Sequence, residues 1–97
     1  MINRMVKGRR LEHKTRHLLE AAGYMVVRAA GSKGAADLVA LRPPGDVRLL
    51  QIKAGTARLP AHEREQLQEL ADLFRGRLTV ELWRWPDRKH DPLIEVL

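Results

Sequence analysis

The chain has 97 residues, the length of one ordinary domain, so we expect a single domain over residues 1–97. Eighteen Lys and Arg residues against twelve Asp and Glu residues give a net charge of +6, which favours nucleic acid over an acidic small molecule as partner. The absence of cysteine excludes disulfides and Cys-ligated zinc, and no apolar run has the length of a signal peptide or a membrane helix, so we expect a soluble, cytoplasmic protein without membrane contact.

The first segment is predicted to be a basic helix. Leu11, Leu18, Leu19 and Ala22 recur at helical spacing, which predicts a helix from Arg9 to Ala22 that stops at Gly23. Residues 1–16 contain six cationic side chains and a single acidic one, Glu12. On charge alone, this stretch is either a DNA contact or a solvated basic arm.

The next segments predict strands. Tyr24–Ala29 is short and rich in Val, and a loop at residues 31–34 follows it. Two further apolar runs, Asp37–Leu41 and Val47–Lys53, are separated by the turn Arg42–Asp46 with its two prolines and its glycine. These two runs therefore predict a β-hairpin.

The second half contains a helix and two strands. Leu67, Leu70, Ala71 and Phe74 mark one face of a helix over His62–Arg75, and strands are predicted at Leu78–Arg84 and Leu93–Val96. The order of one helix, three strands, one helix and two strands predicts an α/β fold with a mixed sheet.

The hairpin brings polar side chains together. If its turn is symmetric about Pro44, position 41 pairs with 47 and position 37 with 51, so that Asp37 faces Gln51 with Cβ atoms about 5 Å apart. Gln51 and Lys53 then share a face of the sheet with Asp37, while Leu50 and Ile52 point into the core. Paired acidic or amide oxygens suit a hard divalent cation for phosphodiester hydrolysis.

Each of these residues also has an ordinary explanation. Glu12 lies at the edge of the apolar stripe of the first helix, where it can reach the rim of the sheet or pair with Arg16 one turn away. Asp37 alone reads as a turn residue at the start of a strand, and Gln51 and Lys53 read as solvent-facing strand residues. Their combination is more informative than any member.

The combination of Glu12, Asp37 within Gly34–Val39, and Gln51-Ile52-Lys53 resembles the PD-(D/E)xK nuclease superfamily. The segment Val27–Gly34, together with Lys7-Gly8 ahead of Glu12, resembles the archaeal Holliday junction resolvases in particular, and the likeness covers more than half of the chain. This resemblance implies a restriction-endonuclease-like fold, with a central mixed five-stranded sheet flanked by helices. It also implies a homodimer that cuts a four-way DNA junction in pairs and uses Mg²⁺, or Mn²⁺ as a substitute, without a small-molecule cofactor.

The resemblance also assigns roles. Asp37 and Gln51 would ligate the metal, with Glu12 joining them directly or through water, and Lys53 would position or activate the attacking water. Ser32 would assist at the scissile phosphate. The DNA backbone would be held by basic residues, namely Lys7, Arg9, Arg10, Arg28 and Lys33.

Two positions depart from the family pattern. Gln51 stands where the resolvases usually have Glu, and a neutral amide oxygen can coordinate Mg²⁺ but supplies no charge to hold it. Ala36 precedes Asp37, where the superfamily name has Pro. Because Gln51 supplies no charge, a lower metal affinity is expected.

Three other functions remain open from the sequence. One is a nuclease with the same site acting on flaps, forks or duplex DNA, and another is a non-catalytic DNA-binding relative. An RNA-binding domain has only the charge in its favour.

Trp83 and Trp85 share a strand face, where core or dimer burial is favoured over base stacking. His13 and His17 lack the intervening Glu of a zincin motif, so they predict phosphate or solvent contacts.

Overall fold

The computed structural model describes residues 4–29, 36–88 and 90–97, with side chains from residue 8 onward. The elements in chain order are α1 (Arg4–Ala21), β1 (Met25–Arg28), β2 (Leu38–Arg42), β3 (Asp46–Ala54), α2 (Ala61–Leu73), β4 (Thr79–Trp85) and β5 (Leu93–Val96). Within these residues, no helix is both long enough and apolar enough to cross a membrane.

The strands form one five-stranded mixed sheet in the order β1-β2-β3-β4-β5. All neighbouring pairs are antiparallel except β3 and β4, which are parallel. Parallel neighbours need a crossover connection, and α2 provides it. The predicted α/β class and mixed five-stranded sheet are thus confirmed.

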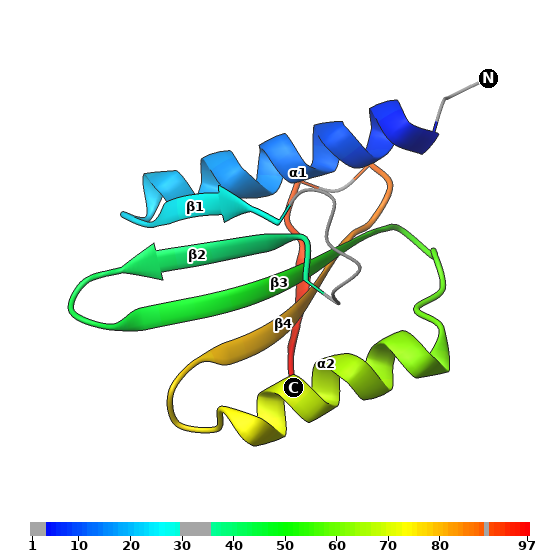
Figure 1. The fold of residues 1–97 in the computed structure, drawn as a ribbon. Coiled ribbons are helices and arrows are strands. Elements are labelled where there is room, and N and C mark those ends of the chain that lie inside the picture. The colour runs from blue at the N-terminus through cyan, green and yellow to red at the C-terminus, as the bar shows by residue number, and fades with distance from the viewer. Residues whose placement is uncertain (1–3, 30–35, 89) are drawn as a thin grey trace.

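The two helices cover opposite faces of the sheet (Figure 1). On the α1 side, Leu19, Val26, Leu38, Leu50 and the two tryptophans form the larger buried cluster. On the α2 side, Leu67, Ala71 and Val80 form a smaller one. Leu49 packs on the α2 side and Leu50 on the α1 side, as the alternation of strand side chains requires.

Trp83 and Trp85 are buried in the α1-side cluster, with 1% and 2% of their surfaces exposed. The prediction that favoured burial over base stacking is therefore confirmed. The indole Nε1 of Trp85 donates to Thr15 Oγ1 at 2.8 Å, which satisfies the one polar group of this ring in the core.

Element boundaries differ from the predicted ones mainly at the helices. α1 begins at Arg4 instead of Arg9. The residues before Leu11 have no apolar stripe, so periodicity did not reveal this first part of the helix, but Arg, Met and Lys have high helix propensity. α2 ends at Leu73, two residues before the predicted Arg75. Phe74 was expected on the core face of this helix, but it lies just past the helix end and is 45% exposed.

Candidate active site

The predicted site residues gather at one end of the sheet. Here the N-terminal half of α1, the ends of β1 and β3 and the beginnings of β2 and α2 lie on the same side of the molecule, at the right in Figure 1. Side chains from elements far apart in the sequence can therefore meet at this end.

The hairpin register is the predicted one. Leu41 pairs with Val47 and Leu38 with Leu50, as predicted, and Asp37 lies one residue beyond the last pair of this ladder. The backbone N–H of Asp37 donates to the carbonyl of Leu50 at 2.7 Å, and the N–H of Ile52 donates to Asp37 Oδ2 at 2.9 Å. Asp37 is thus anchored to β3 through both its backbone and its side chain.

The Asp37 carboxylate lies in surroundings that disfavour its charge. Burial raises its pKa above the ordinary value of 3.8, and the negative charges of Glu12 and Glu63 act in the same direction. The Ile52 N–H and the positive charge of Lys53 lower the pKa without cancelling the rise. A partly desolvated carboxylate near other acids is typical of a site that gains stability from a bound cation.

Gln51 and Lys53 project from β3 toward the α2 side, the face opposite to Leu50 and Ile52. The Lys53 ammonium lies 3.6 Å from Glu63 Oε2 on the first turn of α2, and the Lys53 side chain is 21% exposed. Glu63 was missed in the sequence. Its position three residues after Pro60, at the start of the helix that follows Lys53, was the available signal.

Glu12 meets a partner that local spacing did not suggest. Its Oε2 lies 3.0 Å from Nε of Arg28 at the end of β1, while Arg16 pairs with Glu20 instead. Glu12 and Arg28 therefore neutralise each other at the rim of the site. Glu12 is near enough to influence Asp37 electrostatically. Arg28, which the resemblance assigned to DNA binding, forms an ion pair with Glu12.

Three predicted residues cannot be compared. Ser32 and Lys33 lie outside the described residues, and the side chain of Lys7 is not described either. Arg9 and Arg10 are exposed on α1, as contact with the DNA backbone would require.

The donor set suits a hard cation. In the described part of the chain, no three His, Cys, Asp or Glu side chains form a ready metal-binding group. Mg²⁺, however, is usually held by one or two carboxylates together with water and substrate phosphate oxygens. Asp37, with one oxygen taken by Ile52 N–H, and the amide oxygen of Gln51 supply ligands of this kind.

A basic groove passes through this end of the molecule. One hollow of about 620 Å³ is lined by Gly8, Lys53, Arg58 and Asp87 among others, and it meets a second of about 300 Å³ at Asp87. We define the basic groove by its cationic side chains, which are Arg10, Lys14, Lys53, Arg58, Arg88 and His90.

Most of these cations are not neutralised by a carboxylate. Across the part of the chain that the structure describes, Arg10, Lys14, Arg58 and Arg88 have no ion pair, and Lys14 lies over the Trp85 ring at 4.6 Å. The sequence had pointed to Arg10, but not to Lys14, Arg58 or Arg88 as groove residues. A groove that joins Lys53 and Arg58 with the cations of the neighbouring hollow suits a polyanion.

Comparison with known proteins gives two positive findings. The family model described as archaeal Holliday junction resolvase (Hjc) matches residues 3–89. The solved structure of Archaeoglobus fulgidus Hjc, a Holliday junction resolvase from an archaeal hyperthermophile, superimposes with a TM-score of 0.70 at 24% identity, over 94% of this chain and 71% of that one. A search of curated proteins found no match. The structural likeness shows that the two proteins share a fold.

Proposed function

The chain belongs to the archaeal Holliday junction resolvase family, which makes it a nuclease of branched DNA, and we propose that it uses Mg²⁺ to make paired cuts across four-way junctions. The observation that carries the proposal is that Asp37 lies against the end of β3, where its Oδ2 accepts from the N–H of Ile52, the residue between Gln51 and Lys53. In a chain of this family, that constellation is where hydrolysis would occur.

The proposed metal ligands are Asp37 and Gln51, with Mn²⁺ as a substitute ion. A bound divalent cation would polarise the scissile phosphate and lower the pKa of a water molecule bound to it. The backbone N–H of Ile52 holds Asp37 Oδ2, which fixes the carboxylate orientation and leaves its other oxygen for the cation. The amide of Gln51 has no hydrogen-bond partner among the described residues, so its oxygen can turn toward the same point.

Lys53 is proposed to position the attacking water and to balance the negative charge that develops on the phosphate. Its positive charge acts on the Asp37 carboxylate, and its ammonium lies 3.6 Å from Glu63 Oε2.

The basic groove is proposed as the track of one DNA arm. Its cations line the hollow that contains Lys53 and the hollow next to it, so phosphates near the scissile one would be contacted as well. Phosphate contacts of this kind position DNA without reading sequence. The substrate would therefore be recognised by its branched shape.

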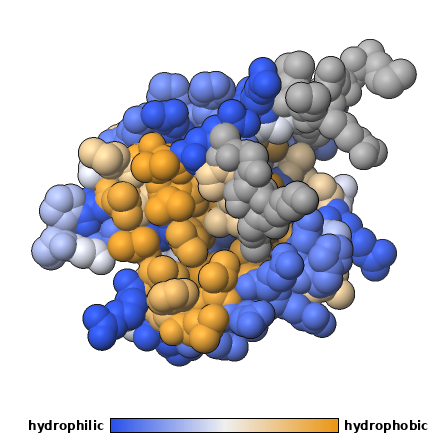
Figure 2. All heavy atoms as spheres, in the orientation of Figure 1, coloured by the Kyte–Doolittle hydropathy of each residue, from blue (hydrophilic) through white to orange (hydrophobic). Residues whose placement is uncertain are grey.

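We also propose that two copies of the chain assemble. Val27 pairs with Val39, and Val39 with Leu49 of the α2-side cluster, so Met25 and Val27 face the α2 side. They are 69% and 48% exposed, and Leu73 and Phe74 at the end of α2 are 70% and 45% exposed. We call these four residues the apolar patch. Figure 2 shows apolar atoms gathered in this region between the two helices.

A second copy of the chain is the occupant that fits the proposed activity. A four-way junction has two strands to cut, and a two-fold dimer would place two identical sites for symmetric cuts. Exposed apolar patches of this kind are typical of interfaces.

The proposed function is tested by incubating a labelled four-way junction, and linear duplex with the same arm sequences, with the protein and Mg²⁺. We expect symmetric nicks on the junction alone, which are lost with EDTA and with Asp37→Asn. Cleavage of duplex, flaps or forks in preference to the junction would contradict the substrate. Tight junction binding without any cleavage in Mg²⁺ or Mn²⁺ would leave only a DNA-binding role.

A further inference from the structure

The Glu63 carboxylate does not take part in capping α2. It stands at the third position of α2, after the N-cap residue Pro60. A Glu at this position ordinarily bonds back to the N–H of the N-cap residue, but proline has no N–H. The Glu63 side chain is therefore available for another contact.

One oxygen of Glu63 lacks a hydrogen-bond donor. Oε2 is buried, and no donor within the described residues reaches it. The Lys53 ammonium at 3.6 Å forms an ion pair with this oxygen but is too distant for a good hydrogen bond. A buried carboxylate oxygen in this condition costs free energy unless a further positive group is supplied.

The location of this oxygen connects it with the proposed metal site. α2 packs on the sheet face that carries Gln51 and Lys53, and the charge of Glu63 acts on Asp37. Although Oε2 is buried, the side chain as a whole is 37% exposed, so a rotation of the carboxylate would bring it to a cation with its water ligands. Glu63 thus lies at the same end of the sheet as Asp37 and contacts Lys53 there.

The charge of the site explains why such a residue is needed. Gln51 contributes an oxygen without charge, and Glu12 is neutralised by Arg28. Asp37 alone would then hold the cation with a single negative charge. Mg²⁺ sites with one or two carboxylates are common, and a second carboxylate strengthens binding through charge.

We propose that Glu63 is a metal ligand in this protein, and that it replaces from α2 the carboxylate that Gln51 does not supply on β3. This inference rests on the proposed function, since it assumes a cation at Asp37. On binding, the Glu63 carboxylate would turn from Lys53 toward the cation and leave the ammonium free for the attacking water.

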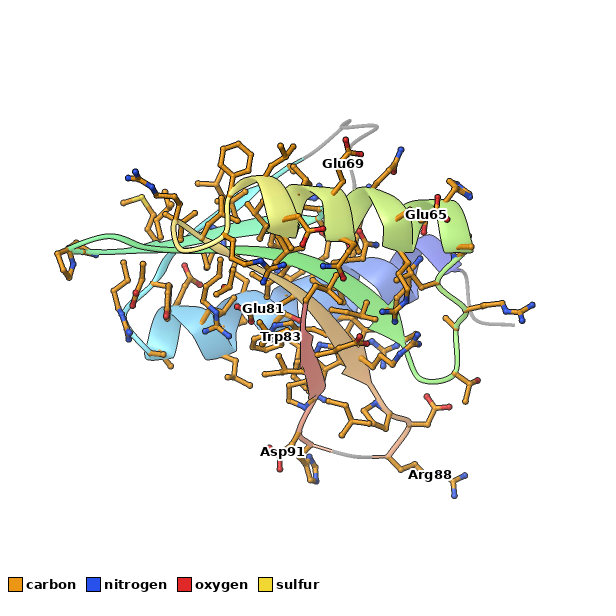
Figure 3. The ribbon with its side chains drawn as sticks, turned by 90° about the horizontal axis from the view of Figure 1, so that it is seen from below. Glu65, Glu69, Glu81, Trp83, Arg88 and Asp91 are labelled. Atoms are coloured by element: carbon orange, nitrogen blue, oxygen red, sulfur yellow. The ribbon has the colours of Figure 1, made fainter. Side chains whose placement is uncertain are left out.

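The test is Mn²⁺ binding to the intact protein without DNA, measured by calorimetry and by electron paramagnetic resonance. The variants are Glu63→Gln, Gln51→Glu, the double variant, and Asp37→Asn. Glu65→Gln is the matched control, because Glu65 is exposed on the same helix and points away from the sheet in Figure 3. The binding measurements are made in about 1 M salt, which shortens the electrostatic screening length to about 3 Å. Charges far from the cation then contribute little to Mn²⁺ affinity.

We expect Glu63→Gln to weaken Mn²⁺ binding by roughly tenfold or more, the size of effect seen when groups around metal sites are removed. Glu65→Gln should leave binding unchanged. The double variant Gln51→Glu with Glu63→Gln should recover most of the loss, because it moves the carboxylate back to β3. Circular dichroism would verify that each variant is folded.

Three results would overturn the inference. If Asp37→Asn abolishes Mn²⁺ binding but Glu63→Gln does not weaken it, Glu63 is only a partner of Lys53 and the proposed function stands. If Gln51→Glu fails to compensate for Glu63→Gln, the two residues do not serve one cation. Absence of Mn²⁺ binding to the unmodified protein at millimolar concentration would contradict the metal-dependent function as well.

Discussion

At the scale of single residues, Asp37 shows how the fold holds a carboxylate in surroundings that disfavour its charge. Its backbone continues the hairpin, while its side chain is partly buried near Glu12 and Glu63. Because the pKa in the folded state is raised, the charged form is less favourable in the folded protein than in the unfolded chain. Stability from this group is present below pH 3.8 and is lost as the pH rises through the folded-state pKa.

Asp37→Asn is therefore expected to stabilise the metal-free protein at neutral pH. The amide removes the disfavoured charge and keeps an oxygen for the Ile52 N–H, so Tm should rise by a few degrees, which corresponds to roughly 1 kcal/mol in a domain of this size. Thermal unfolding in EDTA measures the change, and the difference from the unmodified protein should shrink below about pH 4.

The control for this prediction is Asp91→Asn, because Asp91 is exposed in the turn between β4 and β5 (Figure 3). Its Tm should match that of the unmodified protein. A lower Tm for Asp37→Asn would show that the charge of Asp37 stabilises the fold.

At the scale of elements, β4 carries a buried carboxylate that serves the fold. Glu81 is 2% exposed on the α1 side of the sheet, beside Trp83 (Figure 3). Arg48 of β3 binds both of its oxygens at 2.8 and 2.6 Å, and Thr79 and Trp83 donate at 2.6 and 3.0 Å. Burial opposes the charge, but these hydrogen bonds outweigh it and lower the pKa of Glu81.

Glu81→Gln is expected to lower the free energy of unfolding at pH 7 by about 2–3 kcal/mol, somewhat less than for a fully buried pair because Arg48 is partly exposed. A lowered pKa gives stability that is present above the ordinary value of 4.5 and lost as pH falls through the folded-state pKa. The difference from the unmodified protein should therefore narrow in acid.

Urea unfolding at several pH values measures both effects. Glu95→Gln removes the exposed pair with Arg64 and should cost less than about 1 kcal/mol. Equal losses in the two variants would mean that the buried network adds little.

The turn between β4 and β5 and the first half of α1 together supply the far end of the basic groove. Arg10→Gln and Arg88→Gln should each weaken junction binding, and each lost phosphate contact should reduce the slope of log K against log salt by about 0.9. Fluorescence anisotropy over a salt series measures both quantities.

Arg77→Gln is the matched control for the groove, because Arg77 is exposed between α2 and β4, outside the groove. A slope unchanged by Arg10→Gln and Arg88→Gln would exclude the groove as the DNA track. A smaller slope with unchanged cleavage of saturated substrate would agree with a role in binding alone.

At the scale of the whole molecule, the two helices leave part of each sheet face uncovered. α1 packs on β1 and β3, and α2 packs on β4, so the α2 side of β1 stays exposed and forms the apolar patch together with the end of α2. Small domains bury a smaller fraction of their surface on folding than large ones, and burial of an exposed apolar patch is a common reason for assembly.

Phe74→Lys is expected to shift a dimer to monomer in sedimentation or light scattering, because a charge at the end of α2 would be buried on assembly. Leu93→Gln is the control, since Leu93 is 64% exposed on the opposite edge strand β5. A monomeric unmodified protein at micromolar concentration would contradict the proposed dimer.

The sequence by itself determined the elements, the mixed sheet and the register of the hairpin, in which Leu41 pairs with Val47. These features depend on local information, namely apolar periodicity, turn residues and the fixed alternation of strand side chains. The family was likewise recognisable from motifs along the chain, and the family match confirms it.

Only the tertiary structure decided which distant residues meet. Glu12 was expected to pair with Arg16 or join the metal site, yet it binds Arg28 across two elements. Glu63 reaches Lys53, and Arg58 and Arg88 join one groove, because of how the helices and loops pack on the sheet. Such contacts depend on the relative placement of layers, which local periodicity does not encode.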